Sequence, residues 1–136
     1  MDFQEIRIKT ARTEVQGSLS FFEETKDVPV DIKRISYIYD APEGTKRGGH
    51  AHRNLRQILF CPYGKIEIVL DDASQRQSVM LDDPCKGLLI GPGLWREMIW
   101  HSDRAVLCVA ASEYYDEGDY IRNYEDFLKY KKEGRK

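Results

Sequence analysis

The sequence has no long apolar segment and no strong excess of charge of one sign. The longest apolar run, 105–111, is far too short to span a bilayer, and the first residues lack the apolar core of a signal peptide. The formal net charge is −2, so no basic field attracts nucleic acid. We therefore expect no membrane and no nucleic-acid partner, and local arginine or lysine side chains must meet any anionic ligand.

Cysteine is scarce and odd in number. The chain has three cysteines, Cys61, Cys85 and Cys108, and two of them lie in apolar, strand-like runs. An odd count without a secretory signal argues against a disulfide framework. We expect reduced, buried thiols in a cytoplasmic protein.

Short alternating segments dominate what the sequence does contain. With 136 residues, of which 41% are hydrophobic, we expect one domain over 1–136 with a full core. Glycine and proline predict a loop over 41–49. The regular spacing of segments rich in β-branched and aromatic residues predicts an all-β sandwich or barrel. The expected strands are 5–9, 18–22, 32–40, 50–61, 65–70, 76–81, 87–90, 95–100 and 104–111.

Only the C-terminal segment has a helical pattern. Over 120–131 the apolar residues fall at helical spacing, namely Tyr120, Ile121, Tyr124, Phe127 and Leu128. Asp119 is a suitable N-cap. We expect this helix to lie against the outer wall of the barrel.

The segment 47–64, RGGHAHRNLRQILFCPYG, carries the main functional signal. His50 and His52 stand at i and i+2, so on a β-strand their side chains point to the same face. Imidazoles titrate near neutrality, and a pair aimed into one cavity can move protons or hold a metal ion. The alternative is that both histidines are structural residues with no functional role.

Other residues suggest an anionic, ring-containing ligand. Guanidinium groups suit the oxygens of a diphosphate, and the candidates in or beside expected strands are Arg34, Arg47, Arg56 and Arg96. Trp95 offers a flat face for a base or a sugar. An exposed ion pair for each arginine and a core position for the tryptophan are the structural alternatives.

The spacing around the histidines is similar to the first signature of the cupin superfamily, G-x5-H-x-H-x3–4-E-x6-G. The matching residues are Gly44, His50, His52, Gln57 and Gly64. Gln57 stands where a ligand glutamate would be. In a degenerate second signature, Arg96 stands near the last ligand histidine. Glutamine is a poor ligand and a guanidinium has no lone pair to offer, so we favour a site without metal and keep a metal-dependent cupin as an alternative.

Longer strings resemble a narrower family. IKRISYIYD, RGGHAHRNLRQIL, GLLIGPGLWREM and ASEYYDEGDYIRNYEDF look like the dTDP-4-keto-6-deoxyglucose 3,4-ketoisomerases of the FdtA/QdtA type, over about Ile32 to Phe127. The resemblance implies an all-β, cupin (RmlC-like) jelly-roll barrel with a C-terminal helix. It also implies no cofactor and a homodimer with exchanged strands. The product would be a 3-keto sugar for aminotransferases that make 3-amino-3,6-dideoxyhexoses of surface glycans, such as lipopolysaccharide or S-layer glycan.

The resemblance also implies roles for single residues. His50 and His52 match the paired histidines of the family, Tyr37 its strand tyrosine and Arg47 the arginine ahead of the histidines. The reaction moves the ketone from C4 to C3 through an enediolate. We expect His50 to take the C3 proton and His52 to shuttle a proton, with the order of the two open, and both to titrate near pH 7. Tyr37 and an arginine would stabilise the enediolate.

Around these catalytic residues we expect a set of substrate-binding residues, namely Arg47, Arg34, Gln57, Arg56, Trp95 and Arg96. A dTDP-sugar epimerase and a sugar-nucleotide-binding cupin without catalysis remain alternative functions. The configuration at C4 of the product is open.

Overall fold

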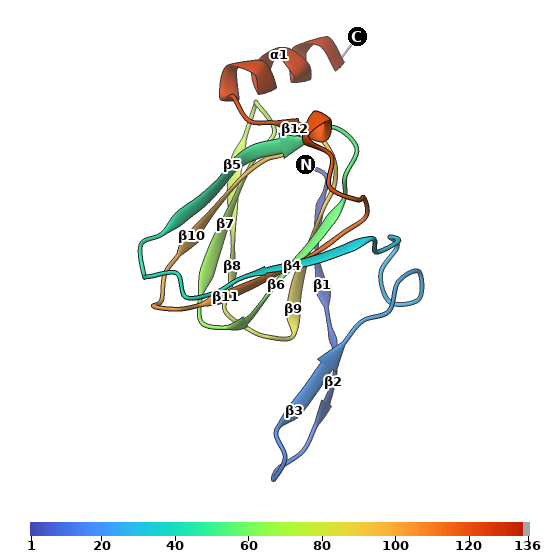
Figure 1. Ribbon diagram of the computed structural model, residues 1–136, viewed down its shortest axis with the longest axis vertical. Coiled ribbons are helices and arrows are strands. Elements are labelled where there is room, and N and C mark those ends of the chain that lie inside the picture. Colours follow the sequence, from blue (N-terminus) through green and yellow to red (C-terminus); the bar gives the residue numbers. More distant parts are fainter. Residues whose placement is uncertain (135–136) are drawn as a thin grey trace.

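Strand pairing divides the chain into two facing sheets. In chain order the elements are β1 (Phe3–Arg7), β2 (Lys9–Arg12), β3 (Ser18–Phe21), β4 (Arg34–Ile38), β5 (Lys46–His52), β6 (Gln57–Tyr63), β7 (Ile66–Asp71), β8 (Arg76–Leu81), β9 (Lys86–Ile90), β10 (Trp95–Trp100), β11 (Val106–Ala111), the 3-10 helix η1 (Glu117–Asp119), β12 (Tyr120–Ile121) and α1 (Tyr124–Gly134). The computed structural model describes residues 1–134, so residues 135 and 136 of the predicted domain lie outside the described residues. One five-stranded sheet has the order β1-β9-β6-β11-β4 and the other β12-β5-β10-β7-β8 (Figure 1). This arrangement confirms the all-β prediction and agrees with a jelly-roll barrel.

The main core lies between the two sheets, because alternate residues of each strand point inward. Leu59, Leu88 and Leu107 of the first sheet belong to one buried cluster with Ile68 and Met98 of the second. Burial of apolar surface, at roughly 25 cal/mol per Å², is the main favourable contribution to such packing. The packed core holds the two sheets at a fixed distance and thereby positions the walls of the cavity described below.

The expected strand 50–61, for which we predict a bend near Arg53 and Asn54, is in fact two strands in different sheets. β5 ends at His52, and β6 starts after a turn. Asp119 fixes this turn: its main-chain oxygen accepts from Arg53 N at 2.9 Å, and its carboxylate accepts from Asn54 N at 2.7 Å. The local sequence pattern contains no sign of an acceptor that comes from so distant a segment, which explains the error.

β5 also begins earlier than expected, inside the predicted loop 41–49. Gly48 and Gly49 lie in this strand with φ of 85° and 74°, a region that glycine adopts readily. A Cβ atom on Gly48 would lie 2.7 Å from Met98 Sδ and 2.9 Å from Arg96 O. Glycine is therefore required here for the close approach of β5 to β10.

α1 starts later than expected. Asn123 Oδ1 accepts from Asp126 N at 3.1 Å, so Asn123, and not Asp119, is the N-cap. Phe127 is completely buried, and its ring centroid lies 5.7 Å from that of Trp95 in β10. The helix packs outside the main core, but across one end of the barrel over β12 and β5 and not along its outer wall (Figure 1).

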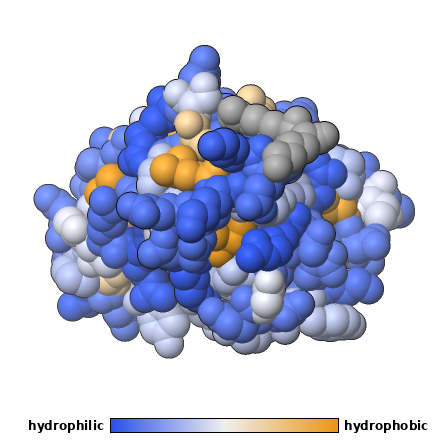
Figure 2. Space-filling model, turned by 90° about the horizontal axis from the view of Figure 1, so that it is seen from above, coloured by the Kyte–Doolittle hydropathy of each residue, from blue (hydrophilic) through white to orange (hydrophobic). Residues whose placement is uncertain are grey.

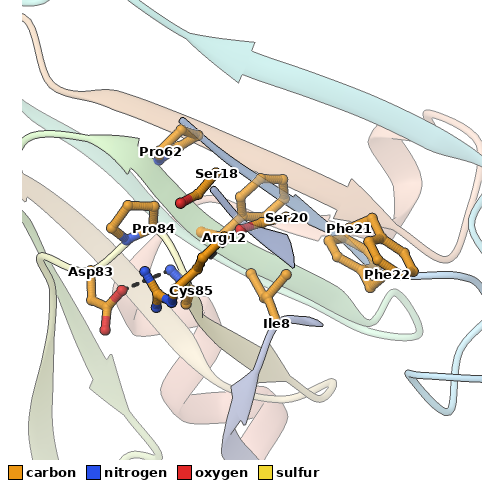
Figure 3. Close-up of a pocket in the computed structure, with 11 residues that line it drawn as sticks. Ile8, Arg12, Ser18, Ser20, Phe21, Phe22, Pro62, Asp83, Pro84 and Cys85 are labelled. Atoms are coloured by element: carbon orange, nitrogen blue, oxygen red, sulfur yellow. Dashed lines mark hydrogen bonds between the residues drawn. The ribbon is translucent and has the colours of Figure 1, made fainter. Parts of the chain in front are cut away.

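A hairpin of β2 and β3 projects from the end of the barrel opposite α1 (Figure 1). Its apolar residues Leu19 and Phe21 are 66% and 43% exposed. A cavity of about 660 Å³ lies between the hairpin and the turn over 83–85, with Arg12 and Cys85 in its lining (Figure 3). The expected strand 5–9 crosses the boundary between β1 and β2, so the sequence pattern did not separate these two strands.

The three cysteines are free thiols. Cys61 and Cys85 are buried as predicted, whereas Cys108 is only partly buried. No helix in the described part of the chain is long and apolar enough to cross a membrane. Seen from the side that carries α1, the surface is mainly hydrophilic with small apolar patches (Figure 2).

Replacement of Phe127 by alanine tests how α1 is anchored. Because the ring is completely buried under the helix, we expect Phe127→Ala to lower the free energy of unfolding by about 3–5 kcal/mol. Leu128→Ala, at a neighbouring residue that is 38% exposed, is the control and should cost less than about 1 kcal/mol. Urea unfolding of both variants measures the difference, and equal losses would contradict the described packing.

Candidate active site between the two sheets

A cavity of about 380 Å³ lies between the two sheets and has the paired histidine strand as one wall. Its apolar lining includes Ile38, Met98, Leu107 and Val109. Its polar lining consists of Arg34, Ser36, Tyr37, Arg47, His50, Gln57 and Tyr120. An apolar wall with a few convergent polar groups is typical of a ligand site. The larger cavity under the hairpin (Figure 3) has no imidazole in its lining, so the smaller one is the candidate site.

The two histidines occupy different depths. The ring centroids of His50 and His52 are 5.0 Å apart, and the rings are nearly perpendicular, at 86°. His50 lines the cavity, whereas His52 is completely buried behind it. The Tyr120 ring packs on both, with centroids 5.2 Å from His50 and 4.4 Å from His52. His50 is therefore the imidazole that a ligand in the cavity meets first.

Asp119 joins the site from η1, far along the chain. Its Oδ2 lies 3.1 Å from His52 Nδ1 and also accepts from Leu55 N at 3.3 Å. The other ring nitrogen of His52, Nε2, is buried without a hydrogen-bond partner among the described residues. Sequence analysis missed this contact, because Asp119 and the following Tyr120 were assigned to the start of a helix.

Pairing between β12 and β5 brings this segment to the histidines. Tyr120 is the register partner of His52, and Ile121 that of Ala51. Ile121 and Ala51 are buried together under α1. A two-residue strand has no periodicity of its own, so only the acidic and aromatic composition of this segment could have marked it for attention.

Arg96 is the charged side chain with the largest electrostatic effect on the two imidazoles. It is completely buried, and it donates to Gln57 Oε1 at 2.6 Å and to the Leu94 carbonyl oxygen at 2.9 Å. Burial lowers the pKa of Arg96 to about 10. Gln57 lines the cavity, whereas Arg96 lies behind it. A direct contact of Arg96 with a ligand therefore stays a prediction.

Burial and this guanidinium change the ionisation of both histidines. Burial first, and Arg96 second, lower the pKa of His50 to about 4. The same causes, followed by the neighbouring His50, also lower the pKa of His52. The expectation that both would titrate near pH 7 is wrong for the free protein, because burial removes water from the charged form. Both imidazoles are neutral at pH 7 and can accept a proton.

Besides Arg96, two further expected substrate-binding residues lie outside the cavity lining, and their contact with a substrate stays a prediction. Trp95 is almost completely buried under α1, and its Nε1 donates to Glu97 Oε2 at 3.1 Å. Arg56 pairs with Asp2 at 3.6 Å and is not part of the cavity lining. The sequence could not distinguish the inner from the outer side of the barrel at these positions.

The remaining predicted residues reach the cavity to different extents. Arg34 and Arg47 line it, and Arg34 Nε is buried without a partner among the described residues. Tyr37 is at its edge, but its side chain is 62% exposed and its ring stacks 5.8 Å from Tyr39. Strand alternation instead directs Ser36 toward the same side as Arg34. The catalytic role of Tyr37 stays a prediction.

Gln57 and Arg96 occupy the positions where a metal-binding cupin would place ligands. Gln57 already accepts from the guanidinium of Arg96, and a cation at this point would repel a divalent ion. Within residues 1–134, no three side chains of His, Cys, Asp or Glu gather as a metal site. Independence from metal stays a prediction, to be tested by activity after chelation.

Comparison with known proteins gives a relative of named activity. Residues 1–132 match the family described as WxcM-like, C-terminal (FdtA). A TDP-4-oxo-6-deoxy-α-D-glucose-3,4-oxoisomerase from Aneurinibacillus thermoaerophilus is 47% identical over 115 residues, which cover 85% of this chain and 83% of that protein.

Solved structures are similar over almost the whole chain. A 3,4-ketoisomerase from Helicobacter canadensis is 42% identical with a TM-score of 0.93, covering 97% of this chain and 98% of that chain. A histidine-to-asparagine mutant of the 3,4-ketoisomerase QdtA from Thermoanaerobacterium thermosaccharolyticum, in complex with TDP-4-keto-6-deoxyglucose, is 39% identical with a TM-score of 0.92, covering 97% and 95%. A dTDP-4-dehydrorhamnose 3,5-epimerase from Bacillus anthracis, 18% identical with a TM-score of 0.77 over 89% and 78%, shares the fold alone.

The ionisation of His50 predicts how stability depends on pH. Its pKa falls from 6.5 to about 4 on folding, so between these values the unfolded chain binds more protons than the folded one. The contribution of this pKa shift to the free energy of unfolding is therefore fully present above pH 6.5 and is lost as the pH falls toward 4. In His50→Asn this loss should be smaller than in the wild type, as measured by urea midpoints across the range. His101→Asn, at an exposed histidine outside the cavity, is the control, and an unchanged slope in His50→Asn would contradict the described burial.

Proposed function

The chain belongs to the WxcM-like, C-terminal (FdtA) family, and from this membership we propose that it is a sugar-nucleotide 3,4-ketoisomerase. It moves the ketone of dTDP-4-keto-6-deoxy-D-glucose from C4 to C3. The observation that carries the proposal is the neutral His50 in the wall of the cavity, in a chain that is 47% identical to a named 3,4-oxoisomerase.

His50 is the base that takes the C3 proton. It lines the cavity and is neutral, so its free ring nitrogen can accept a proton from the sugar. The C–H electron pair then forms the double bond of an enediolate, with negative charge on the oxygen at C4. The hydroxyl proton at C3 passes to that oxygen, and protonation of C4 leaves the ketone at C3.

Positive charge near the cavity stabilises this intermediate. Arg34 and Arg47 line the cavity, and they can face the enediolate or the diphosphate of the substrate. The anionic substrate also offsets the effect of Arg96 and so raises the basicity of both imidazoles when it binds. His52 relays a proton between the two oxygens or to C4, and Tyr37 assists at the edge of the cavity.

The nearest alternative is a 3,5-epimerase, which also removes a proton next to the C4 ketone. Its likeness to this chain concerns the fold alone, and its product would keep the ketone at C4. Proton NMR of the product distinguishes the two reactions. A sugar-nucleotide-binding protein without catalysis would give no product at all.

The product suits a step in surface-glycan synthesis. A 3-keto sugar nucleotide is a substrate for a pyridoxal-type aminotransferase, which leads to 3-amino-3,6-dideoxyhexoses of lipopolysaccharide or S-layer glycan. We place the enzyme in the cytoplasm, where thiols stay reduced, and the three free cysteines support this placement.

We also propose a homodimer with exchanged strands. The β2–β3 hairpin projects from the barrel (Figure 1), all of β3 is exposed, and a two-stranded hairpin is only marginally stable alone in water. Ile35 and Tyr37 on β4, and Tyr39 just after it, add exposed apolar surface. β4 is an edge strand. A second copy of the chain would bury both surfaces.

Substitution of the histidines tests the reaction. We expect His50→Asn and His52→Asn each to lower kcat roughly 100- to 10,000-fold, because each removes a proton-transfer group. Conversion of dTDP-4-keto-6-deoxyglucose, followed by proton NMR, is the assay, and His101→Asn is the control. A variant that keeps more than about a tenth of the wild-type rate would show that its histidine does not have this role.

Substitution on the hairpin tests the dimer. Leu19→Asp together with Phe21→Asp places charges on its exposed apolar face, so the double variant should be a monomer while the wild type is a dimer. Light scattering after size-exclusion chromatography gives the mass. Leu128→Asp, on α1, is the control for added charge, and a wild-type monomer would refute the proposal.

A further inference from the structure

Asp119 accepts more hydrogen bonds than a turn of the chain requires. Its Oδ1 accepts from Asn54 N at 2.7 Å, and its Oδ2 accepts from Leu55 N at 3.3 Å and lies 3.1 Å from His52 Nδ1. The residue is almost completely buried. Both carboxylate oxygens are therefore engaged, one of them by the imidazole.

This contact determines which nitrogen of His52 carries the proton. A carboxylate is an acceptor only, so His52 Nδ1 must donate its hydrogen to Asp119. In the neutral ring the remaining nitrogen, Nε2, then has a free lone pair. Nε2 is buried and has no hydrogen-bond partner among the described residues, which is uncommon for a buried polar atom in a folded protein.

We propose that Asp119 is a positioning residue of the isomerisation, which holds His52 in the Nδ1–H tautomer and so keeps Nε2 free to accept a proton. The proposal rests on the ketoisomerase function proposed above. The contact itself is a property of the fold and can be measured without turnover. It explains why the second histidine, which is not in the cavity lining, is nevertheless held in one orientation.

No other ionisable group around His52 accepts a hydrogen bond from its ring in the described part of the chain. The other ionisable groups around the ring are His50 on its own strand, Tyr120 on β12 and Arg96 on β10. Arg96 and His50 both disfavour a second proton on the ring. Among the described residues, Asp119 is hydrogen-bonded to the His52 imidazole, whereas His50, Tyr120 and Arg96 are not.

Asparagine at this position cannot satisfy the same partners. If its oxygen keeps the bond to Asn54 N, its NH2 group opposes Leu55 N and faces His52 Nδ1, which must then accept and transfer its proton to Nε2. If the amide is reversed, the NH2 group faces Asn54 N and two donors oppose each other. Asp119→Asn therefore weakens the turn after β5 in either orientation, and in the first it also reverses the tautomer of His52.

Asp119→Asn would also lower activity if Asp119 only stabilised the turn, so the test must measure the tautomer of His52 directly. The ¹⁵N chemical shifts of the imidazole nitrogens distinguish a protonated from an unprotonated nitrogen. We expect the wild-type protein, labelled with ¹⁵N-histidine, to give a protonated Nδ1 and an unprotonated Nε2 for His52. Spectra of His50→Asn and His101→Asn assign the signals.

Turnover is then compared between two matched variants. Asp119→Asn should protonate Nε2 and lower kcat roughly 100- to 10,000-fold, as expected for a misplaced imidazole proton. KM should stay within about threefold, because Asp119 is not in the cavity lining. Asp116→Asn is the same substitution in the same turn; its side chain caps η1 through Gly118 N at 3.0 Å, which asparagine can also do, so it should behave as wild type.

The possible results separate this proposal from the proposed function. An Nε2–H tautomer in the wild type overturns the positioning role, as does an Asp119→Asn variant that keeps its tautomer or more than about a tenth of kcat. If Asp119→Asn does not fold, the same two measurements are made on Asp119→Glu. If Asp119→Glu loses the Nδ1–H tautomer of His52 but keeps full kcat, the positioning role of Asp119 is overturned. If the wild type fails to convert the substrate, the ketoisomerase proposal is refuted, while the tautomer spectra still decide whether Asp119 positions His52.

Discussion

A completely buried guanidinium beside two imidazoles is the constraint on which the rest of the site depends. The acceptors of Arg96 are the Gln57 amide oxygen and the Leu94 carbonyl oxygen, which are neutral groups. Neither acceptor carries a charge, although the Asp119 carboxylate favours the charged form of Arg96. The guanidinium opposes protonation of His50 and His52. The arrangement keeps two imidazoles neutral, one in the wall of the cavity and one behind it.

The site is assembled from segments that are distant in the chain. β5 contributes the histidines, β10 contributes Arg96, and the segment after β11 contributes Asp119 and Tyr120. The register between β12 and β5 connects them, because it sets Tyr120 opposite His52. A slip of one residue in this pairing would turn the ring of Tyr120 to the other face. The short strand β12 therefore determines the geometry of the histidine pair as much as β5 does.

Sequence patterns predicted what depends on local periodicity. The all-β architecture, the C-terminal helix against the barrel and the common face of His50 and His52 follow from alternation and helical spacing. Local patterns do not tell the inner from the outer face of a barrel, which is why they do not show that Trp95 and Arg56 lie outside the cavity lining. They also contain no trace of long-range hydrogen bonds, so the contact of Asp119 with His52 was missed. The pKa of His50 differs from the expected value because burial is a property of the folded chain.

The position of β12 long after β5 in the chain has a consequence for biosynthesis. Asp119 and Tyr120 leave the ribosome long after both histidines have been made, yet they supply the Nδ1 acceptor of His52 and the aromatic surface against both rings. Until these residues emerge, the turn after β5 also lacks the acceptor for Asn54 N. The histidine pair of a nascent chain thus stays without these contacts until β12 has emerged, even after β5 has been made.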